Sequence, residues 1–451
     1  MQPNFLFIVA DDLNSWIGAL GRHPDVRTPN IDALARRGTL FVNAYCSAPY
    51  CNASRMGVFT GCLPSTTGIY GNEPLWDVPD RRLTIVELLR SAGYYTFGAG
   101  KVFHGVFDYA TAGRERRNVA RWVERENRSF LWDDFRDNRD EPLPDARPLN
   151  GLFNFDRFDA VPRMYHLFDW GPIPEDREFD MPDAQVLRAV SEFLQDPPRT
   201  PFFCAAGFYK PHLPWHAPKR FFDLYDIEKI SLPLVKHDDL EDVPPIGRKW
   251  ALTPNDHELV TSRNQWRQAV QGYLAAISYV DSLIGQLVEV LDRAGLSEGT
   301  AIVLWGDNGF HLGEKLHWRK FVLWEEATRV PLVIVPPGAS QANRVYDPVS
   351  LIDIFPTIAD MAGLTVEGPD GSSLVPLLAD SGASRTSPAL MTWGKENHSV
   401  RFEHWRYTRY RDGSEELYDL RADPHEWTNL AKHPALQSMC ERPKQAIPLS
   451  G

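Results

Sequence analysis

Short, continuous apolar runs constrain the fold of this chain most strongly. The first run, Phe5–Ala10 (FLFIVA), ends directly at Asp11 and Asp12. Continuous rather than alternating apolarity predicts a strand that is covered on both faces, as in a parallel sheet. Further strands are expected at Leu40–Ala44, Tyr94–Ala99, Phe202–Ala206, Ala301–Trp305 and Leu332–Val335.

Helical patterns lie between these runs. Thr28, Pro29 and Asn30 open a helix over Ile31–Arg37, which Gly38 closes. Further helices are expected at Thr84–Ala92, Ala184–Leu194 and Gln265–Ala294. The alternation of strands and helices predicts an α/β fold with a large, mostly parallel sheet flanked by helices.

Two regions interrupt this alternation. Residues 114–163 are dense in Arg, Asp and Asn, and we predict a surface insertion at the rim of a site. The chain after about residue 368 begins as loop and continues into strand candidates at Ala389–Trp393, Val400–Tyr410 and Leu417–Leu420. We therefore predict a catalytic domain over residues 1–370 and a small C-terminal α+β subdomain over residues 371–451.

Composition excludes several classes of protein. The chain has 451 residues, 43% of them hydrophobic, which is enough for a packed core. A net charge of −12 argues against nucleic-acid and anionic-membrane partners, and no apolar run approaches the length of about 20 residues that spans a membrane. Five cysteines are too few for a disulfide scaffold. Without a recognisable leader we expect a cytoplasmic location, or a periplasmic one if a leader was removed.

Acidic and amide side chains follow two of the predicted strands. Asp11 and Asp12 follow the first strand, and Asp307 and Asn308 follow the strand at 301–305. The carboxyl ends of parallel strands meet at one edge of a sheet, where ligands bind. Oxygen donors of this kind suit a hard cation such as Ca²⁺ or Mg²⁺. The alternative is that these acids cap helices.

A cysteine begins another predicted helix. Cys51 precedes a segment that ends at Thr60 and Gly61, and Arg55 lies four residues on. A cysteine at a helix N-terminus is expected to have a lowered thiol pKa and to face a helix end that holds an anion, which Arg55 could also bind. The alternative is a buried helix with an incidental cysteine.

Three basic clusters each follow a strand or the acidic loop. They are Lys101–His104, Lys210–His216 and Lys315–Lys320. Each alone is typical of a solvated loop, but together, in a chain of net charge −12, they predict a positive pocket for a small anionic ester beside a cation.

The rim of this pocket could be aromatic or basic. Trp215, Trp318 and Trp76 are candidates for a sugar- or aryl-binding rim, with ordinary core packing as the alternative. Basic side chains are candidates for pairing with a substrate carboxylate: Arg319, Lys315 and His317.

The motifs that carry these residues strongly resemble the type I sulfatase family of the alkaline-phosphatase-like superfamily. They run nearly end to end: NFLFIVADDL, TPNIDALARRGTLFVNAYC, CNASRMGVFTG, GKVFHG, KPHLPW, GDNGFHLGE, SLIDIFPTIADMAG and ELYDLRADPHEWTNLA. GKVFHG, KPHLPW and WRK are most similar to the iduronate-2-sulfatase branch. The resemblance implies an alkaline-phosphatase-like sandwich and hydrolysis of a sulfate ester.

The resemblance also implies residue roles. Cys51 matches the cysteine that a formylglycine-generating maturation enzyme oxidises; one oxygen of the hydrated aldehyde attacks sulfur, and the other is later deprotonated to expel sulfate. The matching metal ligands for Ca²⁺ or Mg²⁺ are Asp11, Asp12, Asp307, Asn308 and modified Cys51. Arg55 matches the arginine that stabilises the hydrate, Lys101 a sulfate-binding lysine and His104 the base. His212 and Lys320 match groups at the sulfate and its bridging oxygen. The further candidates for substrate binding are Lys210, Trp215, His216, Trp318 and Arg319.

One position departs from the family signature. The signature usually reads Cys-x-Pro-x-Arg, whereas residue 53 is alanine, a minority variant that we expect to allow conversion. Two other functions stay open at this stage: a phosphonate monoester hydrolase or phosphodiesterase of the same superfamily, and a non-catalytic sulfate- or glycan-binding relative with unconverted Cys51.

Overall fold

The computed structural model describes residues 2–108, 119–124, 131–136, 140–142, 149–152, 165, 167–380 and 382–448. Most of the predicted insertion at residues 114–163 lies outside this range, so its placement at the rim of a site stays a prediction.

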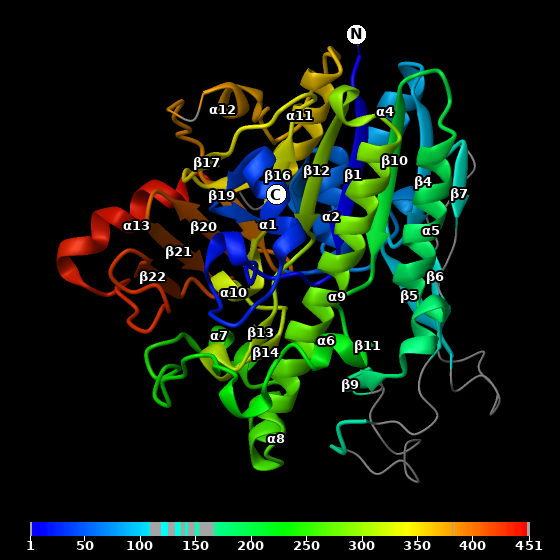
Figure 1. Ribbon diagram of the computed structural model, residues 1–451. Coiled ribbons are helices and arrows are strands. Elements are labelled where there is room, and N and C mark those ends of the chain that lie inside the picture. Colours follow the sequence, from blue (N-terminus) through cyan, green and yellow to red (C-terminus); the bar gives the residue numbers. More distant parts are fainter. Residues whose placement is uncertain are drawn as a thin grey trace.

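An eight-stranded mixed sheet forms the centre of the molecule, in the order β17-β2-β16-β12-β1-β10-β4-β7 (Figure 1). Its strands are β1 (Asn4–Ala10), β2 (Thr39–Phe41), β4 (Tyr95–Gly100), β7 (Asp134–Arg136), β10 (Phe202–Phe208), β12 (Thr300–Gly306), β16 (Leu332–Val335) and β17 (Asn343–Val345). All neighbours pair in parallel except those of β16, which runs antiparallel to β12 and β2. The predicted α/β fold with a mostly parallel sheet is confirmed.

Strand β1 shows why the apolar runs are continuous. Leu6 and Ile8 pack into one buried cluster, whereas Phe5, Phe7 and Val9 pack into another on the opposite face. The first cluster includes side chains of α1 (Pro29–Arg37), α5 (Pro182–Gln195) and α9 (Trp266–Arg293); the second includes side chains of α2 (Cys51–Thr60), α4 (Ile85–Ser91) and α11 (Ile354–Met361). A strand buried on both faces needs apolar side chains at every position.

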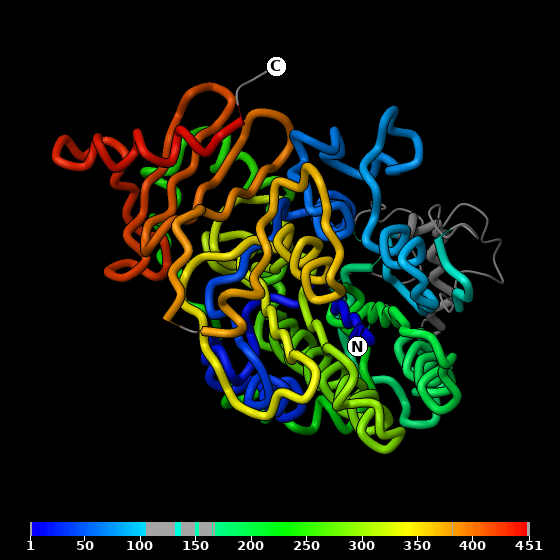
Figure 2. Tube along the Cα trace, turned by 90° about the horizontal axis from the view of Figure 1, so that it is seen from above, coloured from blue at the N-terminus to red at the C-terminus, as the bar shows by residue number. Residues whose placement is uncertain are grey.

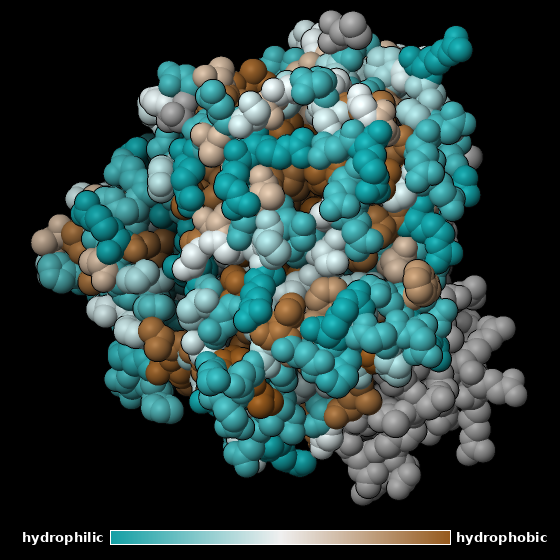
Figure 3. All heavy atoms as spheres, in the orientation of Figure 1, coloured by the Kyte–Doolittle hydropathy of each residue, from teal (hydrophilic) through white to brown (hydrophobic). Residues whose placement is uncertain are grey.

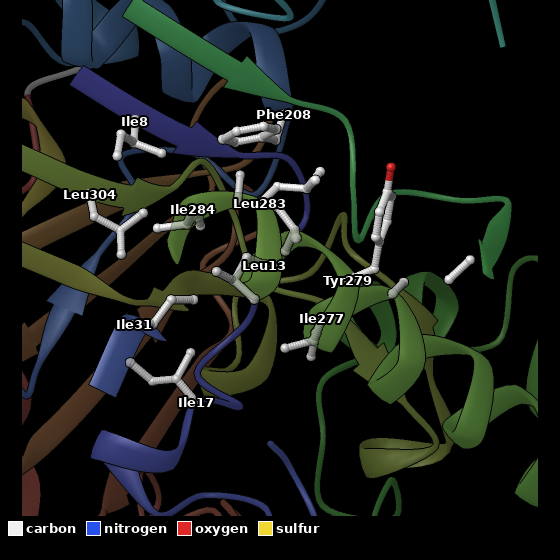
Figure 4. Close-up of a cluster of buried hydrophobic side chains, with 14 of the residues drawn as sticks. Ile8, Leu13, Ile17, Ile31, Phe208, Ile277, Tyr279, Leu283, Ile284 and Leu304 are labelled. Carbon is white, nitrogen blue, oxygen red and sulfur yellow. The ribbon is translucent and has the colours of Figure 1, made fainter. Parts of the chain in front are cut away.

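Helix α9 is the longest helix of the described chain and crosses one face of the sheet. In Figure 4, Ile284 of α9 lies toward Leu304 of β12 and Ile8 of β1, and Leu283 lies near Phe208 of β10. The helix is long and apolar enough to cross a membrane, but 78% of the window that meets this criterion is buried inside the protein. It is therefore a core helix.

A second, antiparallel sheet forms the C-terminal part, which Figure 2 shows in orange and red beside the central body. Its strands are β19 (Ala389–Thr392), β20 (His398–Phe402), β21 (Trp405–Arg409) and β22 (Glu415–Asp419), followed by helix α13 (Gln437–Lys444). The single strand expected at Val400–Tyr410 was wrong, because Glu403 has a φ of 47° and the chain reverses there between β20 and β21. The small C-terminal sheet subdomain is confirmed; the domain boundary near residue 370 stays a prediction.

Shorter elements connect these layers. The helices are α3 (Pro64–Thr67), α6 (Lys219–Phe222), α7 (Pro245–Ala251), α8 (Asp256–Ser262), α10 (Glu325–Thr328) and α12 (Val375–Ala379). The strands are β3 (Ala44–Tyr45), β5 (Gly105–Asp108), β6 (Val119–Glu124), β8 (Asp140–Pro142), β9 (Trp170–Ile173), β11 (Trp215–Pro218), β13 (His311–Leu312), β14 (Trp318–Arg319), β15 (Arg329–Val330) and β18 (Val349–Ser350). The face in Figure 3 is mainly hydrophilic, as expected of a chain with net charge −12.

Candidate active site

Two neighbouring strand ends bring four polar side chains together. Asp11 and Asp12 follow β1, and Asp307 and Asn308 follow β12; all four are buried. The backbone N–H of Asp12 donates to Asp307 Oδ1 at 2.9 Å, and Asn308 Nδ2 donates to Asp12 Oδ1 at 2.8 Å. Tyr273 of α9 donates its hydroxyl to the Asp12 carbonyl at 2.7 Å. The carboxyl ends of adjacent parallel strands thus supply one compact set of oxygen donors.

Cys51 begins helix α2 and points into this set. Its Sγ lies 3.3 Å from Asp11 Oδ1 and 3.7 Å from Asp12 Oδ1. Gly61 ends the helix with a φ of 70°, a conformation that glycine adopts readily, as the Thr-Gly pair predicted. One ligand atom from each of Asp11, Asp12, Asp307 and Cys51 lies within 4.8 Å of the others, so these residues could hold one metal ion.

Arg55, one helical turn after Cys51, orients the carboxylates. Its Nε donates to Asp307 Oδ2 at 2.9 Å, and its Nη2 lies 3.3 Å from Asp11 Oδ1. Nη1 donates to the Val102 carbonyl at 2.9 Å, at the end of β4. The side chain is fully buried, so Arg55 joins the ends of three strands and fixes the geometry of the acidic set.

Further basic side chains surround the acidic set. The Lys101 ammonium contacts Asp11, and the Lys320 ammonium contacts Asp12 and lies 2.7 Å from Cys51 Sγ. His212 Nε2 lies 3.7 Å from Asp12 Oδ2. The structure therefore brings one residue of each basic cluster to the acidic set: Lys101, His212 and Lys320.

Asp11 and Asp307 of this set have opposite pKa shifts. Burial alone would raise the pKa of Asp11, but Lys101, His212 and Arg55 outweigh it and hold that pKa well below its usual value. Burial and the charge of Asp11 raise the pKa of Asp307 to about 6. Two carboxylates so close together share the available positive charge unequally.

The pKa of the Cys51 thiol differs from the sequence-based prediction. A lowered pKa for Cys51 was predicted from its place at a helix N-terminus; instead, burial and the charges of Asp11 and Asp307 raise the thiol pKa well above its usual value. The prediction was wrong because the helix end is sealed from solvent and lined by carboxylates, and these effects exceed those of Lys320 and Lys101.

The imidazoles of His104 and His212 are neutral at neutral pH. Burial, together with the charge of Lys101, places the pKa of His104 well below its usual value. Burial lowers the pKa of His212 to about 4. A neutral imidazole can accept a proton, which is what a general base requires. Lys320 stays charged, because the charge of Asp12 raises its ammonium pKa despite the opposing effect of burial.

The donor set fits a hard cation. Asn308 Oδ1 is buried and has no hydrogen-bond partner in the described part of the chain. This carbonyl oxygen lies in a set that already offers three carboxylates, and buried acceptors of this kind are normally satisfied. Oxygen ligands are those that Ca²⁺ and Mg²⁺ prefer.

Two of the predicted rim residues belong to the core. Trp215 is fully buried and packs against Tyr273 and Phe310. Trp318 is 1% exposed and donates its indole N–H to His257. The prediction that they line a rim was wrong, because Trp215 packs against Tyr273 of α9 and Trp318 packs against Phe168 and Trp215.

Other predicted substrate-binding side chains already have partners within the protein. His216 Nε2 lies 3.0 Å from Asp169 Oδ2, and Lys210 Nζ donates to the Pro214 carbonyl at 2.7 Å. Arg319 Nε donates to Asp256 at 2.6 Å, Lys315 Nζ donates to Asp239 at 2.8 Å, and His317 bonds two backbone carbonyls. Because their side chains are buried and already paired, two predictions are corrected: that Lys315 and His317 pair with a substrate carboxylate, and that Lys210 and His216 bind substrate. Arg319 is only partly buried, but its charge is paired.

Trp76, the third tryptophan predicted at the rim, is half-buried, with the Arg81 guanidinium 4.2 Å from its ring centre.

The sequence motifs did not indicate one aromatic group beside Cys51. Tyr50, Phe321 and Trp393 contact one another, with each pair of ring centres 5.5 Å apart. Tyr50 precedes Cys51 and Phe321 follows Lys320, so adjacency in sequence could have signalled these two. Nothing local indicates Trp393, which the C-terminal sheet supplies.

Comparison with known proteins places the chain in a family. The family model "Sulfatase" matches residues 3–364, more than two thirds of the chain. The chain belongs to the sulfatase family. A second family model, "N-sulphoglucosamine sulphohydrolase, C-terminal", matches residues 313–448. The predicted membership, and the hydrolysis of sulfate esters that it implied, are confirmed.

Individual relatives agree with this assignment. A "Sulfatase" of Formosa agariphila is 35% identical over 99% of this chain and 86% of its own length. The choline-sulfatase of Rhizobium meliloti is 32% identical over 96% of this chain and 83% of its own length. The human iduronate 2-sulfatase is 29% identical over 80% of this sulfatase and 69% of its own length.

Solved structures agree on the fold. The phosphonate monoester hydrolase of Agrobacterium radiobacter has a TM-score of 0.75 and 22% identity, covering 99% of this sulfatase and 94% of its own chain. A 2-O GAG sulfatase has a TM-score of 0.73 and 21% identity, and the match covers 99% of this chain and 91% of its own chain. At such identities the likeness shows the fold alone, so the first neighbour gives no preference for phosphonate esters.

Proposed function

We propose that this sulfatase hydrolyses the sulfate ester of a sugar or uronic acid, with formylglycine derived from Cys51 and a bound Ca²⁺ or Mg²⁺. The observation that carries the proposal is the placement of Cys51 Sγ among the ligand atoms of Asp11, Asp12 and Asp307, within 4.8 Å of one another. A thiol with a raised pKa is a poor nucleophile, so the position makes chemical sense for a modified side chain.

The cation and the modified residue supply complementary chemistry. Hydrated formylglycine would supply the attacking oxygen, and a cation on Asp11, Asp12, Asp307 and Asn308 would polarise the sulfate. Arg55 orients Asp11 and Asp307 for this purpose.

The surrounding side chains supply charge and proton transfer. Lys101 and Lys320 place positive charge beside the sulfate oxygens, and neutral His104 accepts the proton whose removal expels sulfate. His212 or Lys320 binds the bridging oxygen, and the charged Lys320 stabilises it as the bond breaks.

The names of relatives support a uronate substrate. They include iduronate 2-sulfatase and Delta 4,5-hexuronate-2-O-sulfatase, the second 26% identical over 96% of this chain. Choline-sulfatase, another relative, is the alternative in which the leaving group is small and cationic.

The proposal is tested by turnover on protein whose Cys51 peptide carries formylglycine by mass spectrometry. Activity on an aryl sulfate, a phosphate diester and a phosphonate monoester with the same leaving group is compared with added Ca²⁺. We expect kcat/KM to be highest for the sulfate. A higher value for the diester or the phosphonate would contradict the proposal, as would a peptide that remains a thiol in active protein.

Removal of the metal is expected to abolish activity and lower the unfolding temperature. The buried carboxylates of Asp11, Asp12 and Asp307 would then lack a divalent counter-charge, and a metal present at 100 times its Kd stabilises the fold by about 2.7 kcal/mol. The measurement is activity and thermal unfolding after chelation, and again after Ca²⁺ or Mg²⁺ is restored. Full activity in protein shown to be metal-free would contradict a role for the cation.

An Asn308→Ala variant sharpens this test. It removes the buried carbonyl oxygen that has no hydrogen-bond partner in the described chain, and it leaves the three carboxylates in place. We expect the variant to need more Ca²⁺ for half-maximal activity than the wild type does. An unchanged requirement would show that Asn308 is not a ligand.

A further inference from the structure

The aromatic group of Tyr50, Phe321 and Trp393 is partly exposed and lies beside the site. Each of the three side chains is half-buried, as are His104 and His212, whereas Cys51 is 2% exposed. The ring of Tyr50 lies 6.4 Å from that of His104. The aromatic group is therefore a partly exposed neighbour of the buried acidic set, where the part of a substrate beyond its sulfate could lie.

Two of these residues are next to catalytic residues in the sequence. Tyr50 precedes Cys51, and Phe321 follows Lys320, whose ammonium lies 2.7 Å from Cys51 Sγ. Phe321 also has a φ of 76°, an unusual conformation for a bulky residue, and its backbone N–H donates to the Pro49 carbonyl at 3.3 Å. A backbone held in this region is typical of a functional constraint.

The third residue comes from the C-terminal sheet. Trp393 follows β19, where the Thr392 N–H donates to the Ser47 carbonyl at 2.8 Å and so joins this sheet to the segment before Cys51. The side chain of Asn397 donates to the Trp393 carbonyl at 3.0 Å. Trp250 packs against the Trp393 ring at an interplanar angle of 72°. Trp393 is thus held in place without a ligand.

The three rings form one packed surface, called here the aromatic wall, rather than a cage that encloses a ligand. The Trp393 and Tyr50 rings are stacked at 26°, and Phe321 contacts both with its ring centre 5.5 Å away. Rings that already contact each other leave no space between their faces for a quaternary ammonium, which aromatic cages enclose. A continuous aromatic surface instead suits the flat apolar face of a sugar ring.

Lys320 lies beside this aromatic group, with its Nζ 5.9 Å from the centre of the Phe321 ring, and the same ammonium contacts Asp12. The aromatic group therefore borders the basic side chains that surround Cys51.

We propose that Trp393, with Tyr50 and Phe321, forms the subsite that binds the sugar ring bearing the sulfate ester. The proposal rests on the proposed function and names the leaving group that this sulfatase selects. Trp393 is a specificity-determining residue here: it contacts the sugar, whereas the sulfate contacts the basic side chains around Cys51.

The test measures binding without turnover. A Cys51→Ala protein and its Trp393→Ala derivative are titrated calorimetrically with a 2-O-sulfated hexuronate disaccharide, methyl sulfate and choline sulfate. We expect Trp393→Ala to weaken disaccharide binding by about tenfold, since an aromatic contact with its buried area is worth about 1.4 kcal/mol, and to leave methyl sulfate unchanged. Trp393→Phe should retain part of the affinity.

Trp405→Ala provides a matched control. Trp405 lies in the same C-terminal sheet but packs in a separate cluster, and its loss should leave disaccharide binding unchanged. Equal disaccharide affinity with and without Trp393 would overturn the proposal. So would an equal loss for methyl sulfate, a loss confined to choline sulfate, or no disaccharide binding by the Cys51→Ala protein.

Turnover separates this proposal from the proposed function. In formylglycine-containing protein, Trp393→Ala should raise KM for the disaccharide and leave kcat/KM for methyl sulfate unchanged. If matured wild-type protein hydrolyses no sulfate ester, the proposed function fails, and the binding titration still decides the role of Trp393.

Discussion

A Cys51→Ala variant is expected to lose sulfate ester hydrolysis by about 10⁴-fold or more, the scale seen when a nucleophile is removed from an enzyme. Alanine cannot be converted to formylglycine, so the variant has no attacking oxygen. The fold should persist, because Cys51 makes no disulfide and its neighbours Asp11 and Asp307 are also held by Arg55. Activity and thermal unfolding are measured on the same preparation.

Another buried cysteine provides the control. Cys440 of α13 packs in the C-terminal cluster, and Cys440→Ala should keep full activity with a modest loss of stability. If Cys51→Ala retains a tenth of the wild-type rate on a matched sulfate ester, Cys51 is not the source of the nucleophile. The remaining side chains would then have to provide one.

An Arg406→Met variant is expected to lower the free energy of unfolding by about 3–5 kcal/mol, because removing one partner leaves buried charge uncompensated. Arg406 of β21 is fully buried. Its Nη2 donates to Glu325 Oε1 at 2.6 Å, its Nε lies 3.2 Å from Glu426 Oε1, and its Nη1 donates to the Leu323 carbonyl at 2.7 Å. This arginine joins the C-terminal sheet to the segment that follows Lys320. Urea denaturation gives the measurement.

Two further variants separate charge from packing. The exposed pair of Arg442 and Glu403 is the control, and Arg442→Met should change stability by less than about 1 kcal/mol. Adding Glu325→Gln to Arg406→Met should recover part of the loss, since the uncompensated carboxylate is then gone. A loss of less than 1 kcal/mol in Arg406→Met would contradict this account.

The pH dependence of stability provides a second readout of the same pair. Burial alone would raise the pKa of Glu325, but Arg406, Arg401 and Arg329 outweigh it and hold that pKa at about 2, against 4.5 for an ordinary glutamate. A lowered pKa in the folded state contributes stability above pH 4.5 that is lost as the pH falls toward 2. The acid-induced loss should be smaller in Arg406→Met, because its Glu325 pKa lies higher.

Much of the site follows from local sequence. Continuous apolarity in Phe5–Ala10 predicted a strand buried on both faces, and the position of Asp11 directly after it predicted a strand-end ligand. The Thr-Gly pair predicted where the helix that begins at Cys51 ends. These features depend on neighbours in the chain, so periodicity and capping residues encode them.

Local sequence could not predict which tryptophan side chains are buried. Trp215 and Trp318 are aromatic residues in basic clusters, as expected of a substrate rim, yet both lie in the core, whereas Trp393 is half-buried beside Tyr50. An indole suits either environment, and the choice depends on which elements pack over it. That packing involves partners far apart in sequence, such as α9 over Trp215.

The chain's residue order alone accounts for the strands that end at Asp11 and Asp307, and for the helix that begins at Cys51, because these are local properties of strands and helices. Three-dimensional packing alone accounts for the raised thiol pKa of Cys51, the ion pair of Arg406 with Glu325 and the wall that includes Trp393. A pKa sums burial and every nearby charge, and a contact between residues some 80 positions apart leaves no trace in local periodicity.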